Sequence, residues 1–385
     1  MKKIKIVRII TRLSISGSSQ HVMEMAAMFN SGRYSTTVVY GNVESYEQDN
    51  LYLANDLGLN MINLPRMKRE ISPVNDILTI WKLWRIMRKI KPDIVHTHTA
   101  KAGQVGRLAA WLAGVPIIIH TFHGNNFKGY FGRFFSGVSV NLERLMARLS
   151  TCIIAISERQ RRELLAFRIA PVGKIRVIPR GIDLGRIKYG SGDAGKFKQE
   201  QGIHRDKKLI GFIGRLTQIK NPYCFINVAA RVLKERRDAV FIFAGDGEMT
   251  EELRSRVNSL GLRENVIFTG FIKDLRPLYA DLDALLLTSF NEGTPVAILE
   301  SMANSVPVIA SRVGGVPDLI EDGVSGSLFD PEDAGGFAKC VLDLLEDPAK
   351  YQKMAEAVAE TINRDYTLAR LRENMEALIQ ELAGR

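Results

Sequence analysis

Two carboxylates lie close to a predicted helix start in NEGTPVAILE, residues 291–300. Thr294 is a good N-cap residue and Pro295 suits the first helical position, so the amides that follow should lack partners within the helix. Free amides at the positive end of a helix dipole favour an anion such as phosphate. Glu292 and Glu300 would then accept hydrogen bonds from hydroxyl groups of the molecule that carries the phosphate. The stretch therefore predicts a site for a phosphorylated ligand with hydroxyl groups.

Two cations follow the first strand of the second half in GRLTQIKNP, residues 214–222. Arg215 and Lys220 would face the helix start and hold a diphosphate between them. A single loop cation is usually solvated, so the prediction rests on the combination with neighbouring loops. AGDGE (244–248) lacks the GxxxxGK[ST] and GxGxxG spacings, which disfavours a nucleoside triphosphatase or an ordinary dinucleotide site. Its glycines permit close approach of a ligand and FTGF (268–271) could read a base, although each is equally well a plain turn or strand end.

Histidines gather after two strands of the first half. His96 and His98 point to one face of their strand, and His123 follows the next strand and precedes Gly124. A lone histidine is usually a satisfied core or surface residue, but a place just past a strand end favours a functional role for His123. His96 and His98 have no third ligand at a recognisable spacing, so we predict no metal site. Gly17, in the turn LSISGSSQH, lets the backbone approach a phosphate or sugar.

The composition is that of a globular protein with unevenly placed charge. The 385 residues carry a formal net charge of +11, and residues 1–185 hold 27 Lys and Arg against 12 Asp and Glu, a net +15. This half suits nucleic acid, an anionic membrane surface or a phosphorylated substrate, or is simply a soluble basic face. We expect a cytoplasmic protein without a signal peptide or membrane span. Cys152, Cys224 and Cys340 fit no disulfide framework or zinc site and are predicted to be buried.

Aromatic and basic residues are mixed in residues 124–149. The segment from Phe127 to Phe135 has both kinds at short spacing, which fits docking on an anionic membrane interface. The same aromatic side chains could equally complete the core of the first domain. Both interpretations stay open.

Short β-branched runs alternate with helical patterns along the chain, which predicts an α/β protein with parallel sheets. A Gly- and charge-rich passage separates two such series, so we expect domains at 1–185 and 186–365. The segment 366–385 is an amphipathic helix that could pack back on the first domain. Ligands of doubly wound sheets bind beyond the carboxyl ends of the strands. The expected strands are at residues 3–10, 36–40, 61–64, 93–98, 116–121, 152–157 and 175–179, then 208–215, 239–245, 265–270, 284–289 and 307–311.

In this order, the motifs resemble the retaining glycosyltransferases of family 4, which have the GT-B fold of two facing Rossmann-like domains with a cleft between them. The resemblance covers nearly the whole chain and is carried by SGSSQH, HTHTAKAG, HTFHG, VIPRGID, GRLTQIKNP, AGDGE, FTGF, the E-x7-E stretch and SRVGGVPDLIEDGVSG. HTHTAKAG resembles members that extend lipid-diphosphate-linked bacterial surface glycans. The resemblance implies transfer of a sugar from a nucleotide diphosphate sugar, expected to be UDP-linked, to a hydroxyl of a glycolipid at the inner face of the cell membrane. It implies no cofactor and no metal, and from the motifs themselves we expect no nucleic-acid partner.

The resemblance also implies roles for individual residues. Arg215 and Lys220 would hold the donor diphosphate, and Glu300 would accept the ribose hydroxyls. Glu292 would lie beside the donor sugar and His123 near its 6-hydroxyl. The catalytic residues would thus be His123, Arg215, Lys220 and Glu292. The donor would also contact Gly17, Gly214, Gly245, Phe271, Gly293, Thr294, Pro295 and Val296. The acceptor would contact His98, Lys101, Asn125 and Lys128.

Two positions depart from the family pattern. The first loop reads Ser16-Gly17-Ser18 where the family often has two adjacent glycines, and Arg180 replaces the usual Asn of VIPNGID. Two other functions fit parts of the sequence. A UDP-sugar 2-epimerase shares the fold but usually lacks the E-x7-E context. A nucleic-acid-binding protein would suit the basic half, but no helix-turn-helix, RNA-binding or zinc pattern is present.

Overall fold

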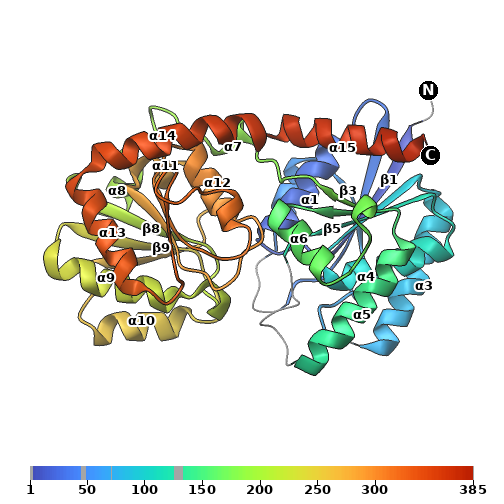
Figure 1. The fold of residues 1–385 in the computed structure, drawn as a ribbon, viewed down its shortest axis with the longest axis horizontal. Helices are drawn as coiled ribbons and strands as arrows, with labels where there is room; N and C mark the ends of the chain where they lie inside the picture. Colours follow the sequence, from blue (N-terminus) through green and yellow to red (C-terminus); the bar gives the residue numbers. More distant parts are fainter. Residues whose placement is uncertain (1–2, 45–48, 71, 125–132, 385) are drawn as a thin grey trace. The chain divides into compact units, whose positions relative to one another are not determined.

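The chain forms two compact units in a computed structural model that describes residues 3–44, 49–70, 72–124 and 133–384. One unit comprises Met1–Arg180 with Ala369–Arg385, and the other comprises Gly181–Leu368. Each unit is a sheet covered on both faces by helices (Figure 1). The boundary predicted from the sequence lay five residues later, at 185, and the returning helix was predicted to start at 366.

Within the described residues, the first unit holds a seven-stranded parallel sheet in the order β3-β2-β1-β4-β5-β6-β7. The direction of winding reverses between β1 and β4, so their carboxyl ends form the topological switch point where such sheets bind ligands. The strands are β1 (Ile4–Arg12), β2 (Tyr34–Gly41), β3 (Asn60–Asn63), β4 (Ile94–His98), β5 (Ile117–Phe122), β6 (Cys152–Ala155) and β7 (Ile175–Val177). The helices are α1 (Gly17–Met28), α2 (Leu51–Asp56), α3 (Pro73–Ile90), α4 (Ala100–Leu112), α5 (Arg133–Leu149) and α6 (Glu158–Ala166).

The described part of the second unit holds a six-stranded parallel sheet in the order β10-β9-β8-β11-β12-β13. Its switch point lies between β8 and β11. The strands are β8 (Lys208–Ile213), β9 (Ala239–Ala244), β10 (Val266–Gly270), β11 (Ala284–Leu287), β12 (Val308–Ser311) and β13 (Ser327–Phe329). The helices are α7 (Leu184–Ile187), α8 (Lys196–Glu200), α9 (Pro222–Glu235), α10 (Thr250–Ser259), α11 (Arg276–Asp281), α12 (Val296–Ala303), α13 (Ala334–Glu346) and α14 (Pro348–Asp365). Strand β13 was not predicted from the sequence, because three residues are too few to show alternation.

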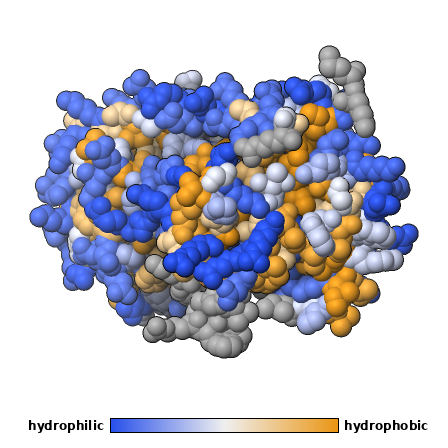
Figure 2. All heavy atoms as spheres, turned by 45° about the vertical axis from the view of Figure 1, so that its right-hand side comes forward, coloured by the Kyte–Doolittle hydropathy of each residue, from blue (hydrophilic) through white to orange (hydrophobic). Residues whose placement is uncertain are grey.

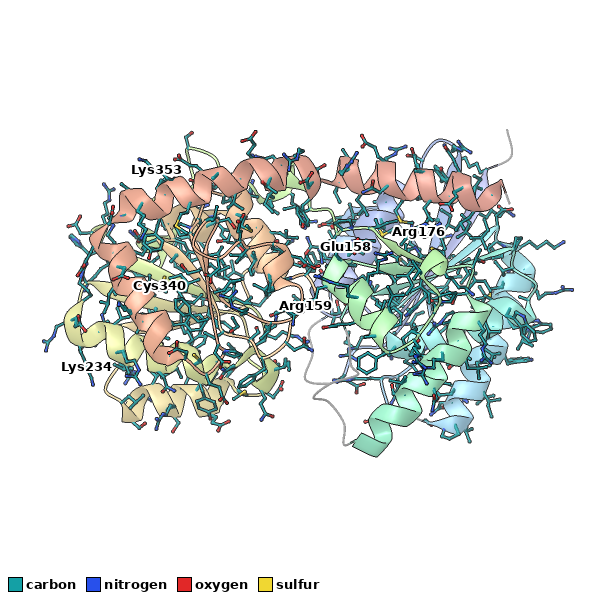
Figure 3. The ribbon with its side chains drawn as sticks, viewed as in Figure 1. Glu158, Arg159, Arg176, Lys234, Cys340 and Lys353 are labelled. Carbon is teal, nitrogen blue, oxygen red and sulfur yellow. The ribbon has the colours of Figure 1, made fainter. Side chains whose placement is uncertain are left out.

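Helix α15 (Leu368–Ala383) belongs to the first unit, although it follows the whole second unit in the chain. Leu371, Met375 and Leu378 are buried on its inner face. Arg176 at β7 donates a hydrogen bond to Glu381 of α15 with an N–O distance of 2.8 Å (Arg176 is labelled in Figure 3). The first unit is therefore built from two stretches of chain that are far apart in sequence.

Most of the apolar residues form the cores between sheets and helices, and all three cysteines are buried free thiols, as predicted. Hydrophobic side chains also reach the surface among hydrophilic ones (Figure 2). No helix among the described residues is long and apolar enough to cross a membrane. The side chains from Phe127 to Phe135 lie outside those that the structure describes.

Candidate functional site

The loops after β8 and β11 meet at the switch point of the second unit. Lys220, from the first loop, donates a hydrogen bond to Oε1 of Glu292, from the second, at 2.5 Å. The Ser289 hydroxyl donates to the same oxygen at 2.7 Å. The Glu292 side chain is 8% exposed and that of Lys220 23%, so the pair is largely shielded from water. A cation and a carboxylate predicted to act on one ligand thus lie in direct contact.

Backbone contacts fix the positions of these loops. The Thr288 hydroxyl donates to the Asn221 carbonyl at 2.9 Å, and the Phe290 amide donates to the Ile219 carbonyl at 2.8 Å. Gly245, after β9, has φ +150°, and a Cβ atom there would lie 2.0 Å from the Gly214 carbonyl oxygen. Gly245, the first glycine of AGDGE, is therefore needed for the loops after β8 and β9 to pack together.

The helix start differs from the prediction by one residue. Helix α12 begins at Val296, and Pro295 is its N-cap residue, with φ −70° and ψ 120°. The assignment of Thr294 as N-cap and Pro295 as first helical residue was wrong. Pro295 has no N–H, but its carbonyl accepts the first helical hydrogen bond, from Leu299, at 3.3 Å. An extended proline satisfies this position without strain, because its ring fixes only φ. The helix start still lies just after the loop that carries Glu292 and Thr294.

Glu300 lies one to two turns into α12 and is buried. Oε2 of Glu300 accepts a hydrogen bond from the Tyr279 hydroxyl of α11 at 2.9 Å. Burial and the Glu300 carboxylate raise the pKa of Tyr279 well above its ordinary value, so the phenol stays protonated and is a permanent donor. Tyr279 was not predicted from the sequence, because the lone tyrosine in RPLYAD belongs to no motif.

A second glycine-dependent contact supports Glu292. Gly314 has φ +51°, and a Cβ atom there would lie 1.7 Å from the Glu292 carbonyl oxygen. The next amide, of Gly315, donates to that oxygen at 3.1 Å. The glycine pair after β12 therefore holds the backbone of Glu292 in place.

Gly314→Ala is expected to lower the free energy of unfolding by about 1 to 2 kcal/mol for the positive φ and by about 1 to 3 kcal/mol more for the clash. Gly323 is a matched control, since it has φ +77° and nothing within 4 Å of a Cβ atom. Gly323→Ala should show only the first of these costs. Urea unfolding of both variants measures the difference, and equal losses would show that the Glu292 contact does not matter.

At the switch point of the first unit, a residue with a strained backbone, Thr99, links the end of β4 to β1 through a hydrogen bond. Thr99, directly after β4, has φ +65°, which is costly for a β-branched side chain. Its hydroxyl lies 2.7 Å from that of Thr11, and the Thr11 hydroxyl accepts from the Ala102 amide at 3.1 Å. Strain maintained by such contacts is typical of functional sites.

Beside this turn, histidines from three elements cluster. Nδ1 of His98 and Nε2 of His123 are 2.9 Å apart, so one ring donates a hydrogen bond to the other. The ring of His21, from α1, lies 5.3 Å from that of His123. Burial, followed by the charge of Arg180, lowers the pKa of His123 to about 3. Near neutral pH these imidazoles are uncharged, and they suit sugar hydroxyls better than phosphates.

The adjoining His96 has a defined tautomer. Arg8 can only donate, and its guanidinium nitrogen lies 2.8 Å from Nδ1 of His96. Nδ1 is therefore unprotonated, so Nε2 carries the proton and donates it to the Thr121 hydroxyl at 2.7 Å. His96 is thus fully engaged in structure, and His98 and His123 are the histidines placed at the strand ends.

Arg180, which replaces the family's asparagine, is 4% exposed. It donates a hydrogen bond to the Gly17 carbonyl and lies 3.8 Å from Glu24 of α1. Glu24 also accepts from Gln20 at 2.8 Å. Arg180 therefore anchors the Ser16-Gly17-Ser18 turn, the other departure from the family pattern.

The remaining predicted residues are dispersed. Arg215 is exposed in the loop after β8 and Phe271, after β10, is 38% exposed. Lys101 pairs with Asp76 of α3 at 2.6 Å, which gives it a structural contact. Asn125 and Lys128 lie outside the described residues.

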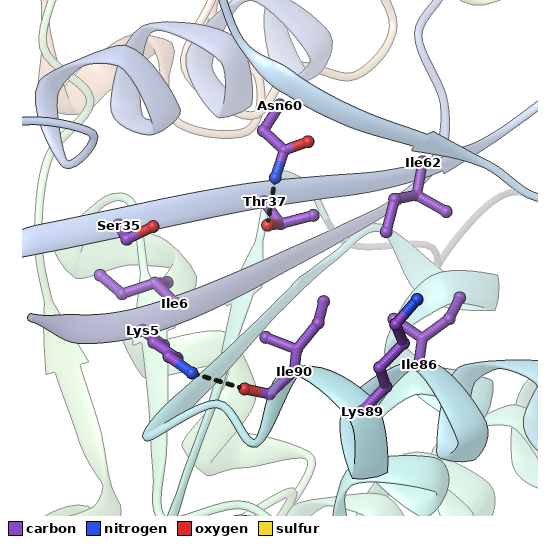
Figure 4. A pocket seen from close by; sticks show the side chains of 9 residues that line it. All are labelled: Lys5, Ile6, Ser35, Thr37, Asn60, Ile62, Ile86, Lys89 and Ile90. Carbon is purple, nitrogen blue, oxygen red and sulfur yellow. Dashed lines mark hydrogen bonds between the residues drawn. The ribbon is translucent and has the colours of Figure 1, made fainter.

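A cavity of about 460 Å³ in the first unit lies elsewhere (Figure 4). It is lined by residues near the amino ends of β1 and β3, such as Lys5 and Asn60, and by the last turn of α3. Since ligands of parallel sheets bind at the carboxyl ends of strands, this cavity is not the candidate site.

No cluster of His, Cys, Asp and Glu within the described ranges has an arrangement that could hold a metal ion. The ring nitrogens of the histidine cluster are available for hydrogen bonds. That the reaction needs no metal ion stays a prediction.

Comparison with known proteins agrees in both halves of the chain. The family model described as Glycosyltransferase Family 4 matches residues 15–186, and the model described as Glycosyl transferases group 1 matches residues 193–361. A UDP-Gal:alpha-D-GlcNAc-diphosphoundecaprenol alpha-1,3-galactosyltransferase from Escherichia coli is 30% identical over 287 residues, which cover 74% of each chain. The capsular polysaccharide biosynthesis glycosyltransferase CapM from Staphylococcus aureus is 27% identical over 307 residues, 78% of this chain and 77% of CapM.

The fold has close relatives among solved structures. HepE from Anabaena, solved with UDP and glucose, superimposes with a TM-score of 0.84 at 21% identity, over 98% of this chain and 99% of HepE. A sucrose-phosphate synthase from Thermosynechococcus elongatus gives a TM-score of 0.81 at 18% identity, over 99% and 100% of the two chains. On these matches, the chain belongs to the glycosyltransferases of family 4 and has their GT-B fold.

Proposed function

We propose that this glycosyltransferase moves a sugar, with retention of anomeric configuration and without a metal ion, from a UDP-sugar to a hydroxyl of a lipid-diphosphate-linked glycan. The observation that carries the proposal is the Lys220–Glu292 contact at the start of α12, with Glu300 buried in the same helix. The relatives support the substrates, since one acts on a diphosphoundecaprenol-linked sugar and HepE was solved with UDP and glucose.

The site's chemistry fits a diphosphate leaving group. The acceptor oxygen would form a bond to the anomeric carbon on the face from which the bond to the diphosphate breaks. The acceptor's proton would pass to the leaving phosphate oxygen. Charge then grows on the diphosphate, where Lys220, Arg215 and the amides at the start of α12 would stabilise it. Lys220 would exchange its contact with Glu292 for the phosphate, which leaves Glu292 to accept a sugar hydroxyl.

The buried Glu300 would bind the ribose of the nucleotide. Tyr279 occupies Oε2 as a permanent donor and so orients the carboxylate. In the first unit, one N–H of the uncharged pair of His98 and His123 joins the two rings, so the pair would offer sugar hydroxyls one remaining N–H donor and one acceptor nitrogen. With such an acceptor, the enzyme would work at the inner face of the cell membrane, bound peripherally to its anionic surface.

The donor site can be tested by thermal shift with UDP and UDP-sugars. UDP is expected to raise the melting temperature of the wild type equally with and without EDTA, because a ligand of the folded form stabilises it. Glu300→Gln should weaken UDP binding about tenfold or more, through loss of charge-assisted hydrogen bonds to the ribose. Glu251, whose side chain is 92% exposed on α10, provides the matched Glu251→Gln control.

Lack of any shift with uridine nucleotides would contradict the proposed donor, and a shift abolished by EDTA would contradict metal independence. Retention is read from the anomeric configuration of the product. Incubation with a UDP-sugar but no acceptor should give no epimerised sugar, which separates transfer from the 2-epimerase reaction.

A further inference from the structure

Helix α3 presents an unusual outer face to solvent. Val74, Ile77 and Trp81 are 70%, 66% and 49% exposed. They follow each other at helical spacings of three and four residues, and Arg85 and Arg88 continue the same stripe. We call these five residues the outer face of α3. Single exposed apolar residues need no explanation, but an aligned set does.

The outer face is not needed for the fold. The opposite side of α3 carries the buried residues Thr79, Leu83 and Met87, and the last two join the core beneath the sheet. The exposed side chains were therefore free to be polar without cost to the core. Their apolar character indicates a contact outside this chain.

The charge of the helix indicates the kind of partner. α3 carries four basic residues, Lys82, Arg85, Arg88 and Lys89, and all are exposed. Its one acidic residue, Asp76, is paired with Lys101. The Arg85 guanidinium lies 4.9 Å from the centre of the Trp81 ring. Tryptophan beside arginine and lysine, on a helix whose one acid is already paired, matches the interface of an anionic bilayer.

The position of α3 ties this face to the site of the first unit. Lys5, near the start of β1, donates to the carbonyl of Ile90 at the end of α3 at 3.0 Å, so this end lies at the amino edge of the sheet (Figure 4). The start of α3 lies at the carboxyl edge, where Asp76 contacts Lys101 just after β4. Val74 and Ile77 are therefore at the same edge as His98.

We propose that the outer face of α3 docks the protein on anionic lipid, with its apolar first half in the headgroup region and its basic second half on lipid phosphates. The helix is about 27 Å long, so it would lie along the surface without crossing the bilayer. The proposed function includes an anionic membrane surface as a partner, and the outer face of α3 is where the protein would bind it. This inference rests on the proposed function, which supplies the lipid-linked acceptor. The outer face of α3 is a different part of the chain from residues 127–135, which the sequence suggested as a membrane-docking segment.

Sedimentation with vesicles tests the surface. The wild type should bind vesicles that contain equal amounts of phosphatidylglycerol and phosphatidylcholine, and should bind pure phosphatidylcholine far less. The triple variant Val74→Ser, Ile77→Ser and Trp81→Ser should lose about tenfold or more of this affinity. Arg85→Gln alone should lose about fivefold. Val172→Ser is the matched control, because Val172 is 58% exposed in the same unit but outside α3.

Equal binding by the triple variant and the wild type would overturn the proposal, and so would wild-type binding that does not depend on phosphatidylglycerol. The UDP thermal shift, measured on the wild type and on the triple variant, keeps the two hypotheses apart. If both proteins show the UDP shift but bind anionic vesicles equally, only the α3 surface is wrong. If both show the UDP shift and neither binds anionic vesicles, the anionic membrane partner is wrong as well and the donor stands. If the wild type shows no UDP shift but binds anionic vesicles through α3, only the proposed donor is wrong.

Discussion

Lys220→Ala is expected to lower kcat for sugar transfer about a thousandfold and to change the KM for the UDP-sugar much less. The reason is that Lys220 would meet the charge that grows on the leaving diphosphate, and one such preorganised group contributes about 3 to 4 kcal/mol to transition-state stabilisation. In the resting site this ammonium group is 2.5 Å from Glu292, so it is already held where the phosphate would arrive. Initial-rate kinetics over a range of UDP-sugar concentrations separate kcat from KM.

Lys234→Ala is the matched control for this experiment. Lys234 is an exposed lysine on α9 of the same unit, far along the helix from the switch point, and is labelled in Figure 3. Its replacement should leave both constants unchanged. A loss of less than tenfold in Lys220→Ala, or a loss seen only in KM, would mean that Lys220 merely neutralises Glu292.

Acidification is expected to unfold the first unit before the second. Burial is the largest cause that lowers the pKa of four buried histidines well below the ordinary value; they are His21, His96, His98 and His120. A histidine whose pKa is lowered in the folded state contributes stability that is present above its unfolded pKa and is lost as the pH falls. The loss therefore begins near pH 6.5 and continues downward. Between about pH 7.5 and about pH 5.5, these four groups and His123, whose pKa burial also lowers, lose about 7 kcal/mol together, comparable to the stability of a whole domain.

The second unit has no buried histidine that would destabilise it at low pH, because its one histidine, His204, has a side chain that is 76% exposed. All three tryptophans, Trp81, Trp84 and Trp111, lie in the first unit, so urea unfolding followed by tryptophan fluorescence reports that unit alone. Pulse labelling of thiols at about pH 5.5 should modify Cys152 before Cys224 and Cys340 of the second unit. His204→Gln should change neither result. A fluorescence midpoint that does not depend on pH would contradict the prediction.

The fold was predictable because buried parallel strands leave a strong pattern. Runs such as PIIIHT and AVFIFAG are apolar and β-branched, and their alternation with helical segments predicts βαβ units. β13 was missed because it has only three residues. The GT-B assignment came from the order of the motifs, which the family comparison confirmed.

The site was predictable where it depends on position along the chain, and less so where it depends on contacts between distant residues. Lys220 and Glu292 follow strands that flank the switch point, so the topology brings them together. Tyr279 was missed because its contact with Glu300 joins two different helices. The N-cap was displaced by one residue because Pro295 is compatible with both the N-cap and the first helical position.

The split of the first unit between residues 1–180 and 369–385 has a consequence for synthesis. While a ribosome adds the intervening residues, at about 5 to 20 per second, the first unit waits about 10 to 40 seconds without α15. During this time most of the second unit can emerge and begin to fold, although it comes later in the chain. The nascent first unit must meanwhile keep exposed the apolar surface that Leu371, Met375 and Leu378 later cover. This interval is when the nascent chain is most open to chaperones, to aggregation and to proteases.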